Sequence, residues 1–177
     1  MIIGVDVDEV LAALHDPWDL WLREKYGVTP DWSDWHIDKT TGLGGKVFSF
    51  ITPEIYTDGT VMAYPEAYTA LAMLRDAGHT IWYTTSCIRG TEEAKLDWLK
   101  GYGLWDNDDE YKPGRDKNLP ELDLLIDDRF ANCVAVDCPA ILITREWNEK
   151  HPFYPRAGCV LEAAERVVHP DRFYFTG

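Results

Sequence analysis

Short apolar runs alternate with longer amphipathic segments along most of the chain. The apolar runs are rich in β-branched or aromatic residues and predict buried strands at residues 2–5, 80–85, 122–126 and 140–144. The amphipathic segments predict helices at residues 65–78, 92–100 and 160–168. A strand that follows a helix usually returns parallel to the strand before it. The pattern therefore predicts an α/β fold, a three-layer sandwich with helices on both faces of a mainly parallel sheet.

Local signals mark the ends of further helices. Asp16 is the predicted cap of a helix that runs to residue 26, because Pro17 suits the first turn and Gly27 suits the stop. Thr91 is the predicted cap of the helix that follows it, which carries acidic residues in its first turn.

The alternation is interrupted between about residue 14 and residue 63. Beyond its first helix this stretch carries Gly, Thr and Pro among many aromatic residues, with no sustained period. We expect an insertion folded over the sheet, in which most aromatic side chains fill a local core and one or two face a ligand. The aromatic residues concerned are Trp18, Trp21, Trp32, Trp35, Phe48 and Tyr56.

Length and charge narrow the possible partners. The 177 residues, 46% of them hydrophobic, suffice for one core with an elaboration but not for two full domains. A formal net charge of −14 argues against duplex nucleic acid or an anionic membrane as the main partner, because both demand a basic surface. A small phosphorylated substrate is compatible with this charge if a divalent cation, a lysine and helix N-termini compensate locally.

The cysteines and the first residues of the sequence indicate the cellular compartment in which the protein works. Cys87, Cys133, Cys138 and Cys159 lack the spacing of a zinc site, which favours buried free thiols. Charged residues interrupt the apolar start, so no signal peptide is predicted, and no apolar stretch approaches the length of a membrane span. Together these features indicate a reducing cytoplasm.

Polar residues stand at or just after the ends of three predicted strands. Because the carboxyl ends of parallel strands meet at one edge of a sheet, we expect these side chains to lie together. Clustered carboxylates repel one another unless a hard cation neutralises them, and carboxylate oxygens suit Mg²⁺. Lys117, ten residues before the last acidic pair, could reach the same edge and balance a phosphoryl group. The residues at the strand ends are Asp6 and Asp8, Thr85 and Ser86, and Asp127 and Asp128.

The order of these residues resembles the four motifs of the haloacid dehalogenase (HAD) superfamily of phosphotransferases. Within that superfamily the chain is most similar to the 5'(3')-deoxyribonucleotidase family, including the spacing from the lysine to the acidic pair. The stretches that carry the resemblance are Tyr64-Pro65-Glu66-Ala67, Thr85-Ser86, Arg115-Asp116-Lys117 and Asp123-Leu124-Leu125-Ile126-Asp127-Asp128-Arg129. The resemblance implies a HAD-like, Rossmann-type core of residues 1–13 and 64–177, with residues 14–63 as a small, mostly helical cap.

The resemblance also implies catalytic roles for the matched residues. Asp6 would be the nucleophile that becomes an aspartyl phosphate, and Asp8 would act as the general acid and then as the general base. Thr85 and Ser86 would bind the phosphoryl group, while Lys117 would offset its developing negative charge.

A metal site is implied in the same way. The family pattern assigns a Mg²⁺ ion to the Asp6 side chain, the Asp8 backbone carbonyl and the Asp128 carboxylate. Asp127 would bind the ion through water or orient Lys117.

Two residues depart from the family's pattern. Glu9 stands where many members have Gly after the second Asp, and Leu14 stands where the family tends to place an aromatic residue that touches the base. Leu14 is therefore the expected substrate contact at this position. Both departures affect the assignment of the substrate more than the assignment of phosphoryl-transfer chemistry.

The sequence thus predicts a cytoplasmic, Mg²⁺-dependent phosphatase of nucleoside 5'-monophosphates, chiefly deoxyribonucleotides, with a homodimer left open. A HAD phosphatase of another small phosphomonoester, such as a sugar phosphate, is the first alternative, because the insertion that determines specificity has the weakest pattern. A phospho-accepting regulatory module is disfavoured because receiver domains place the lysine last, whereas Lys117 precedes Asp127. A nucleotide-binding protein without catalysis is disfavoured by the intact set of carboxylates.

Overall fold

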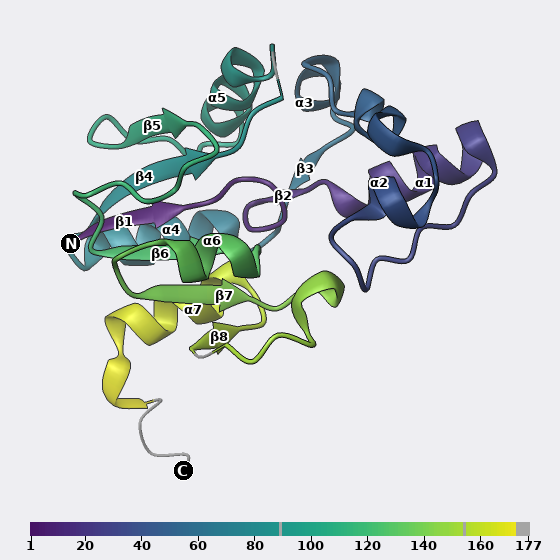
Figure 1. Ribbon diagram of the computed structural model, residues 1–177. Coiled ribbons are helices and arrows are strands. Elements are labelled where there is room, and N and C mark those ends of the chain that lie inside the picture. Colours follow the sequence, from purple (N-terminus) through teal and green to yellow (C-terminus); the bar gives the residue numbers. More distant parts are fainter. Residues whose placement is uncertain (89, 154, 173–177) are drawn as a thin grey trace.

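The protein is built on a six-stranded sheet with the strand order β5-β4-β1-β6-β7-β8 (Figure 1). The structure, a computed structural model, describes residues 1–88, 90–153 and 155–172. All neighbouring strands of this sheet run parallel. The strands are β1 (Ile2–Val5), β4 (Thr80–Thr85), β5 (Glu110–Pro113), β6 (Leu124–Asp127), β7 (Ala140–Ile143) and β8 (Arg156–Ala157).

The helices form two further layers, which confirms the predicted α/β sandwich. Helices α4 and α7 pack together behind the sheet, and α6 lies in front of β6 and β7 (Figure 1). The helices of this core are α4 (Ala67–Asp76), α5 (Glu92–Gly101), α6 (Phe130–Ala135) and α7 (Val160–Val168). Residues 173–177 of the predicted core lie outside the described residues.

Strand β1 is the central strand of the sheet. Its Ile3 and Val5 are fully buried, and Ile3 pairs with Ile81 on one side and Leu124 on the other. A Cβ atom at Gly4 would lie 2.9 Å from a methyl carbon of Leu122, so a larger residue here would require the Leu122 side chain to move. The core places the end of β1, and the residues that follow it, between two other strand ends.

The segment between residues 14 and 61 lies beside the edge toward which β1 points (Figure 1). Two short strands, β2 (Ala12–Ala13) and β3 (Met62–Ala63), pair antiparallel and bring its two ends together. Its helices are α1 (His15–Tyr26), α2 (Ile37–Thr40), a 3₁₀ helix (Gly44–Phe50) and α3 (Glu54–Thr57). Buried Trp18, Leu22 and Val47 share one hydrophobic core with the sheet, so the two parts are packed together.

Several expected helix ends are wrong. Helix α1 begins at His15, one residue before the predicted cap Asp16, whose exposed side chain lies in the first turn. Thr91 does precede α5, but its hydroxyl donates to the Ile88 carbonyl and caps no helical N–H. Helix α4 begins at Ala67, two residues after Pro65.

Some elements lack a strong sequence pattern and were not expected. Strands β5 and β8 and helix α6 are short, and each depends on its neighbours for stability. In the acidic run at residues 106–110, Asp109 is buried against Arg75 and Glu110 begins β5.

The cysteines are free, as expected, but only Cys133 is buried. Within the described ranges, no helix combines the length and the hydropathy that a membrane crossing requires.

Candidate active site

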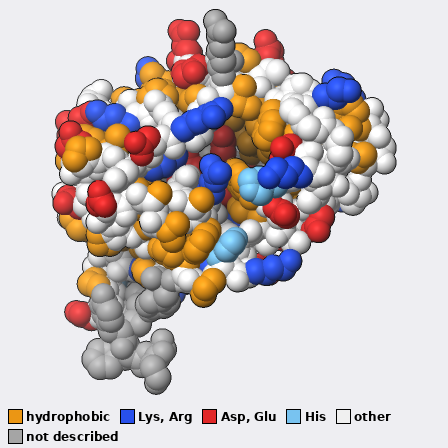
Figure 2. All heavy atoms as spheres, viewed as in Figure 1, with side chains coloured by type: hydrophobic (Ala, Val, Ile, Leu, Met, Phe, Trp, Pro, Cys, Tyr) orange, Lys and Arg blue, Asp and Glu red, His pale blue; other side chains and the backbone are white. Residues whose placement is uncertain are grey.

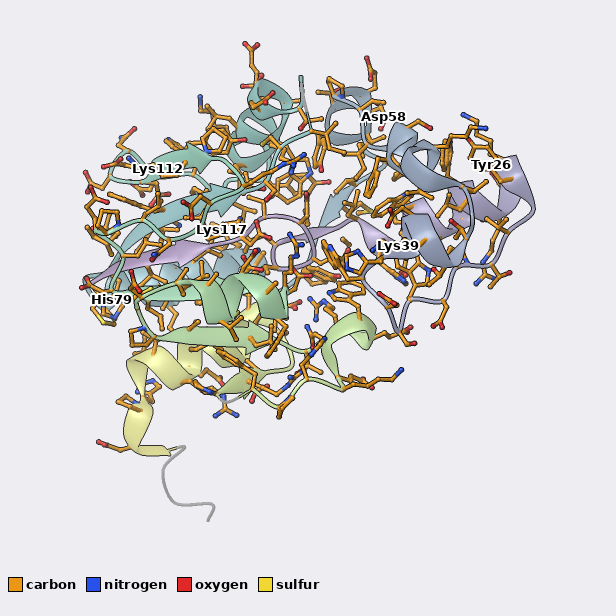
Figure 3. The ribbon with its side chains drawn as sticks, viewed as in Figure 1. Tyr26, Lys39, Asp58, His79, Lys112 and Lys117 are labelled. Atoms are coloured by element: carbon orange, nitrogen blue, oxygen red, sulfur yellow. The ribbon has the colours of Figure 1, made fainter. Side chains whose placement is uncertain are left out.

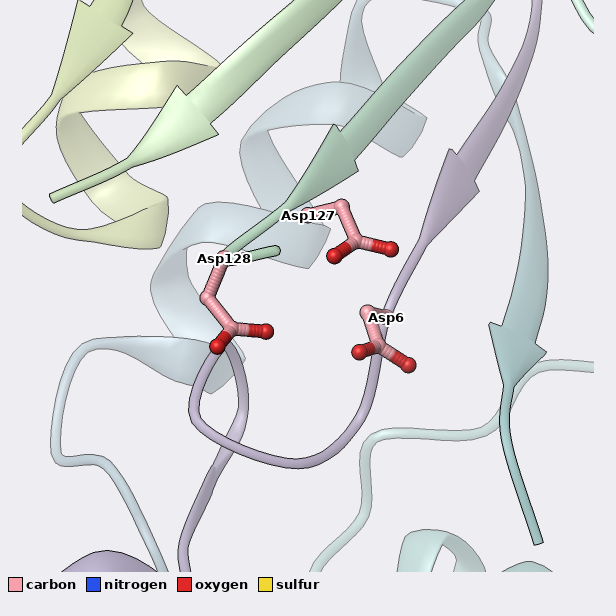
Figure 4. Close-up of side chains that lie close together, drawn as sticks. All are labelled: Asp6, Asp127 and Asp128. Carbon is pink, nitrogen blue, oxygen red and sulfur yellow. The ribbon is translucent and has the colours of Figure 1, made fainter. Parts of the chain in front are cut away.

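Three buried carboxylates meet where β1 and β6 end. Asp6 follows β1 directly, Asp127 is the last residue of β6, and Asp128 comes next (Figure 4). One oxygen from each side chain lies within 4.8 Å of the others. The structure therefore brings together three of the four predicted acidic residues, and it does so through the parallel pairing of two strands that are distant in sequence.

This cluster is electrostatically unfavourable without a cation. Burial, followed by the charge of Asp6, raises the pKa of Asp127 to about 7. Burial and the neighbouring Asp127 and Asp6 raise the pKa of Asp128 well above its ordinary value. Carboxylates at this spacing repel one another strongly where water cannot screen them.

Lys117 supplies one positive charge to the cluster. Its ammonium lies 2.9 Å from Asp6 Oδ1 and 3.9 Å from Asp127 Oδ2, and it also donates to the Thr84 carbonyl. Burial lowers the pKa of Lys117, but the Asp6 and Asp127 carboxylates outweigh that effect and raise it. Lys117 is therefore a fixed cation beside Asp6, where the sequence predicted it.

Asp8 lies apart from the three clustered carboxylates and has partners of its own. Its Oδ2 accepts a hydrogen bond of 2.6 Å from Lys95, and its Oδ1 accepts one of 2.8 Å from the Tyr56 hydroxyl. Burial and the Asp8 charge raise the pKa of Tyr56 well above its ordinary value, so the phenol stays protonated and donates. The two acids after β1 thus occupy different electrostatic surroundings.

The two predicted phosphate-binding residues differ in exposure. Thr85 is fully buried at the end of β4, and its hydroxyl accepts from Lys95 at 3.2 Å. Ser86 is exposed and lines the cavity next to Asp8, while its carbonyl accepts from Lys95 at 2.8 Å. Lys95 thereby links the end of β4 to Asp8.

Glu9 connects the core to helix α1. It adopts a φ of 60°, which a non-glycine residue rarely takes. Its buried carboxylate accepts from the backbone N–H groups of Leu14 and His15, at 2.7 and 2.5 Å, and from the Tyr64 hydroxyl at 2.8 Å. Arg145 lies 3.6 Å away. Burial raises the pKa of Glu9 despite these donors.

A cavity of about 180 Å³ opens above these residues. Figure 2 shows a hollow in the middle of this face, with acidic and hydrophobic side chains inside it and basic side chains and a histidine at its rim. Asp6, Asp8 and Asp128 line the cavity, and so does Leu14. The apolar walls carry His15, Trp18, Trp32, Trp35, Phe48 and Trp147. Four of the aromatic residues singled out in the insertion thus line the cavity.

The comparisons with known proteins agree with this geometry. No family model matches the chain. Two curated proteins named 5'(3')-deoxyribonucleotidase, from Bacillus subtilis (strain 168) and Bacillus phage SPbeta, are each 24% identical to it over 157 residues, which is 83% of this chain and 87% of theirs. A crystal structure of a HAD phosphatase from Thermococcus onnurineus has a TM-score of 0.54 and 15% identity over 95% of this chain and 97% of its own. The chain has the HAD fold. The D,D-heptose 1,7-bisphosphate phosphatase from Burkholderia thailandensis is similarly related, with a TM-score of 0.54 and 11% identity over 95% of this chain and 98% of its own.

The HAD fold and the names of the curated relatives confirm the resemblance found in the sequence. They do not account for Lys95, which sequence reasoning missed. In α5 the buried residues are Ala94, Lys95, Trp98 and Leu99, so Lys95 lies on the apolar face at helical spacing. A lysine on such a face needs a buried acidic partner, and this was the available signal.

Trp147 and Asn148 were also missed. The Trp147 indole donates to Asp128 Oδ2 at 2.9 Å, and the Asn148 amide donates to the Asp128 carbonyl at 2.6 Å. Both belong to a 3₁₀ helix (Glu146–Asn148) whose position depends on tertiary packing, so no local pattern marks them.

Proposed function

We propose that this protein is a Mg²⁺-dependent phosphatase of nucleoside 5'-monophosphates, with deoxyribonucleotides as the preferred class. The observation that carries the proposal is the separation of two acids after β1. Asp6 lies with two further carboxylates and Lys117, whereas Asp8 lies 2.6 Å from Lys95 and faces the cavity. One acid is thus placed for nucleophilic attack, and the other for proton transfer.

In the first step, an Asp6 carboxylate oxygen forms a bond to phosphorus as the bond from phosphorus to the ester oxygen breaks. Asp8 gives its proton to the departing alkoxide. In the second step, Asp8 takes a proton from a water molecule whose oxygen attacks the phosphoryl group, which releases inorganic phosphate and restores Asp6. Lys117 offsets the negative charge that builds up near Asp6 during both steps.

The donor set fits a hard divalent cation. Asp6, Asp127 and Asp128 offer only oxygen ligands, all buried. Burial, together with neighbouring negative charge that Lys117 does not cancel, raises the pKa values of Asp127 and Asp128. When bound, Mg²⁺ would supply positive charge against the phosphoryl oxygens. Asn132 and the Arg129 N–H hold the Asp127 carboxylate in place.

The substrate assignment is supported by the walls of the cavity and by the curated relatives. Residues 14–63 act in this proposal as a cap that covers the site. Its aromatic side chains form an apolar wall suited to stacking on a nucleobase. The two curated relatives are named for a deoxyribonucleotide substrate.

The test is phosphate release from deoxyribo- and ribonucleoside 5'- and 3'-monophosphates and several sugar phosphates, each with Mg²⁺ and with EDTA. We expect turnover with Mg²⁺, concentrated on deoxyribonucleoside 5'-monophosphates and abolished by EDTA. Turnover concentrated on sugar phosphates would agree with the proposed phosphatase mechanism but contradict the proposed nucleotide substrate. Absence of turnover on every phosphomonoester would contradict the enzyme itself.

Asp6→Asn tests the nucleophile in the same assay. The amide keeps the size of the side chain but removes its nucleophilic oxygen anion, so we expect activity to fall to background, at least about 10³-fold. Circular dichroism and a denaturation curve check that the variant is folded. Wild-type activity in folded Asp6→Asn would eliminate the aspartyl-phosphate mechanism.

A further inference from the structure

The tryptophan side chains of the cavity offer ring surfaces rather than hydrogen-bond donors. Four of them line it, and three direct the indole N–H elsewhere. The acceptors are the Val47 carbonyl for Trp18, Asp19 for Trp32 and Asp128 for Trp147, at 2.8 to 2.9 Å. These three rings can stack on a base but have no free N–H to offer it, so hydrogen bonds to the base must come from other groups.

His15 is such a group. It is the first residue of α1, it lines the cavity, and its imidazole meets Trp32 edge-on at 4.3 Å. Its Nδ1 lies 3.0 Å from Asp16 Oδ1. A carboxylate only accepts, so Nδ1 carries the proton, and Nε2 of the neutral ring carries a lone pair.

The Nε2 atom of His15 is buried and lacks a partner. Across residues 1–88, 90–153 and 155–172, only three buried side-chain nitrogen or oxygen atoms have no hydrogen bond, and this is one of them. A buried polar atom left unpaired costs on the order of 1–3 kcal/mol. Because His15 lines the cavity, a small shift of the imidazole on ligand binding would bring this acceptor to a donor on the ligand.

We propose that His15 Nε2 accepts a hydrogen bond from an N–H group of the substrate's nucleobase. This inference rests on the proposed function, and it specifies that the protein recognises an N–H group of the substrate's base. The rings stack on the base with little discrimination, while the imidazole selects for an N–H in one position. His15 is thus a specificity residue, separate from the carboxylates that carry out phosphoryl transfer.

The experiment compares nucleotides with analogues that lack one base donor. The pairs are deoxythymidine 5'-monophosphate with its N3-methyl analogue, and deoxyadenosine 5'-monophosphate with the purine deoxyriboside 5'-monophosphate, which has no amino group. For at least one pair we expect wild-type kcat/KM to be about 10-fold higher for the natural nucleotide, equivalent to about 1.4 kcal/mol. In His15→Phe that ratio should fall to about one, because the ring remains and the acceptor is lost.

Two further variants make the result decisive. His15→Gln keeps an acceptor and should retain part of the discrimination. His79→Phe is the matched control, because His79 lies on the opposite side of the molecule from Lys39 and Tyr26 of the insertion (Figure 3). For each pair, its kcat/KM ratio of natural nucleotide to analogue should equal that of the wild type. Equal ratios in wild type and His15→Phe for every pair would overturn this inference alone. No Mg²⁺-dependent hydrolysis of any phosphomonoester by the wild type would overturn the proposed function, and this inference with it.

Discussion

At the scale of single residues, the two lysines of the site have different partners. Lys117 contacts Asp6, and Lys95 contacts Asp8. Lys95 is also held by the Thr85 hydroxyl and the Ser86 carbonyl, so its ammonium cannot move without breaking two hydrogen bonds. Such an ammonium is rigid, and it holds in place the Asp8 carboxylate, to which we assign proton transfer.

Lys95→Met should therefore impair catalysis while leaving substrate binding largely intact. We expect kcat to fall about 10²-fold, the lower end of the usual contribution of general acid–base catalysis, with a smaller change in KM. Steady-state kinetics of the variant and the wild type measure kcat and KM separately.

Lys100→Met is the matched control. Lys100 lies on the same helix but is exposed, so this variant should behave like the wild type. A Lys95→Met enzyme with unchanged kcat would show that Lys95 has only a structural role.

At the residue scale, the sequence predicted the groups that lie in contiguous motifs. Asp6, Asp127 and Lys117 follow or precede strands whose apolar pattern is strong, and the parallel sheet brings strand ends together as a matter of geometry. Lys95 and Trp147 were not predicted, because their partners lie on other elements. The helical spacing around Lys95 signals its burial but not which acidic residue it contacts.

At the scale of elements, Glu9 holds the start of α1 in place. Its carboxylate accepts from two backbone N–H groups at the helix N-terminus, which is the usual task of a cap residue, although Glu9 lies five residues before Leu14. The sequence predicted Asp16 for this task, because capping rules assume a side chain adjacent to the helix. The presence of helix α4 and strand β4 was predicted because their hydrophobic patterns extend over many residues, although α4 begins two residues later than expected. A two-residue strand such as β8 has too few positions to show a pattern.

A pair of substitutions separates the two features of Glu9, which are the hydrogen bonds of its carboxylate and its positive φ. Glu9→Ala and Glu9→Gly both remove the carboxylate and leave Tyr64 without its acceptor, so both should lower the free energy of unfolding by roughly 2 kcal/mol or more. Glycine tolerates the φ of 60° and alanine does not, so Glu9→Gly should be the more stable variant by about 1 kcal/mol. Urea denaturation of the two variants and the wild type measures the difference. Equal midpoints for the two variants would contradict strain at this residue.

At the scale of the whole molecule, the carboxylate cluster couples stability to pH and to metal. The pKa of Asp127 is about 7 in the folded protein, against an ordinary value of 3.8, and that of Asp128 is also raised. The folded state therefore binds protons more tightly than the unfolded state. The contribution of these two carboxyl groups to the free energy of unfolding is fully present below about pH 4 and is lost as the pH rises through about 7.

This coupling predicts how the melting temperature responds to Mg²⁺. Without metal, ionisation of the cluster should lower the melting temperature between pH 6 and pH 8 by several degrees, on the scale of ~4 °C per kcal/mol for a domain of this size. Added Mg²⁺ should raise the melting temperature more at pH 8 than at pH 6, because the ion binds the ionised carboxylates. Thermal unfolding with EDTA or Mg²⁺ at both pH values measures this effect.

Asp127→Asn serves as the control for this measurement. It removes one of the coupled acids and should reduce both the pH dependence and the response to Mg²⁺. An equal response to Mg²⁺ in the variant and the wild type would place the ion elsewhere.

The central place of β1 also has a consequence for how the chain is made. Strand β1 leaves the ribosome before β6, with which it pairs, so one edge of β1 stays open until residues 124–127 have been synthesised. Asp6, whose N–H donates to the Ile126 carbonyl, meets Asp127 and Asp128 only then. A nascent chain that stops before β6 has Asp6 but lacks the other two carboxylates of the cluster. The three carboxylates thus come together only when most of the sheet is present to enclose them.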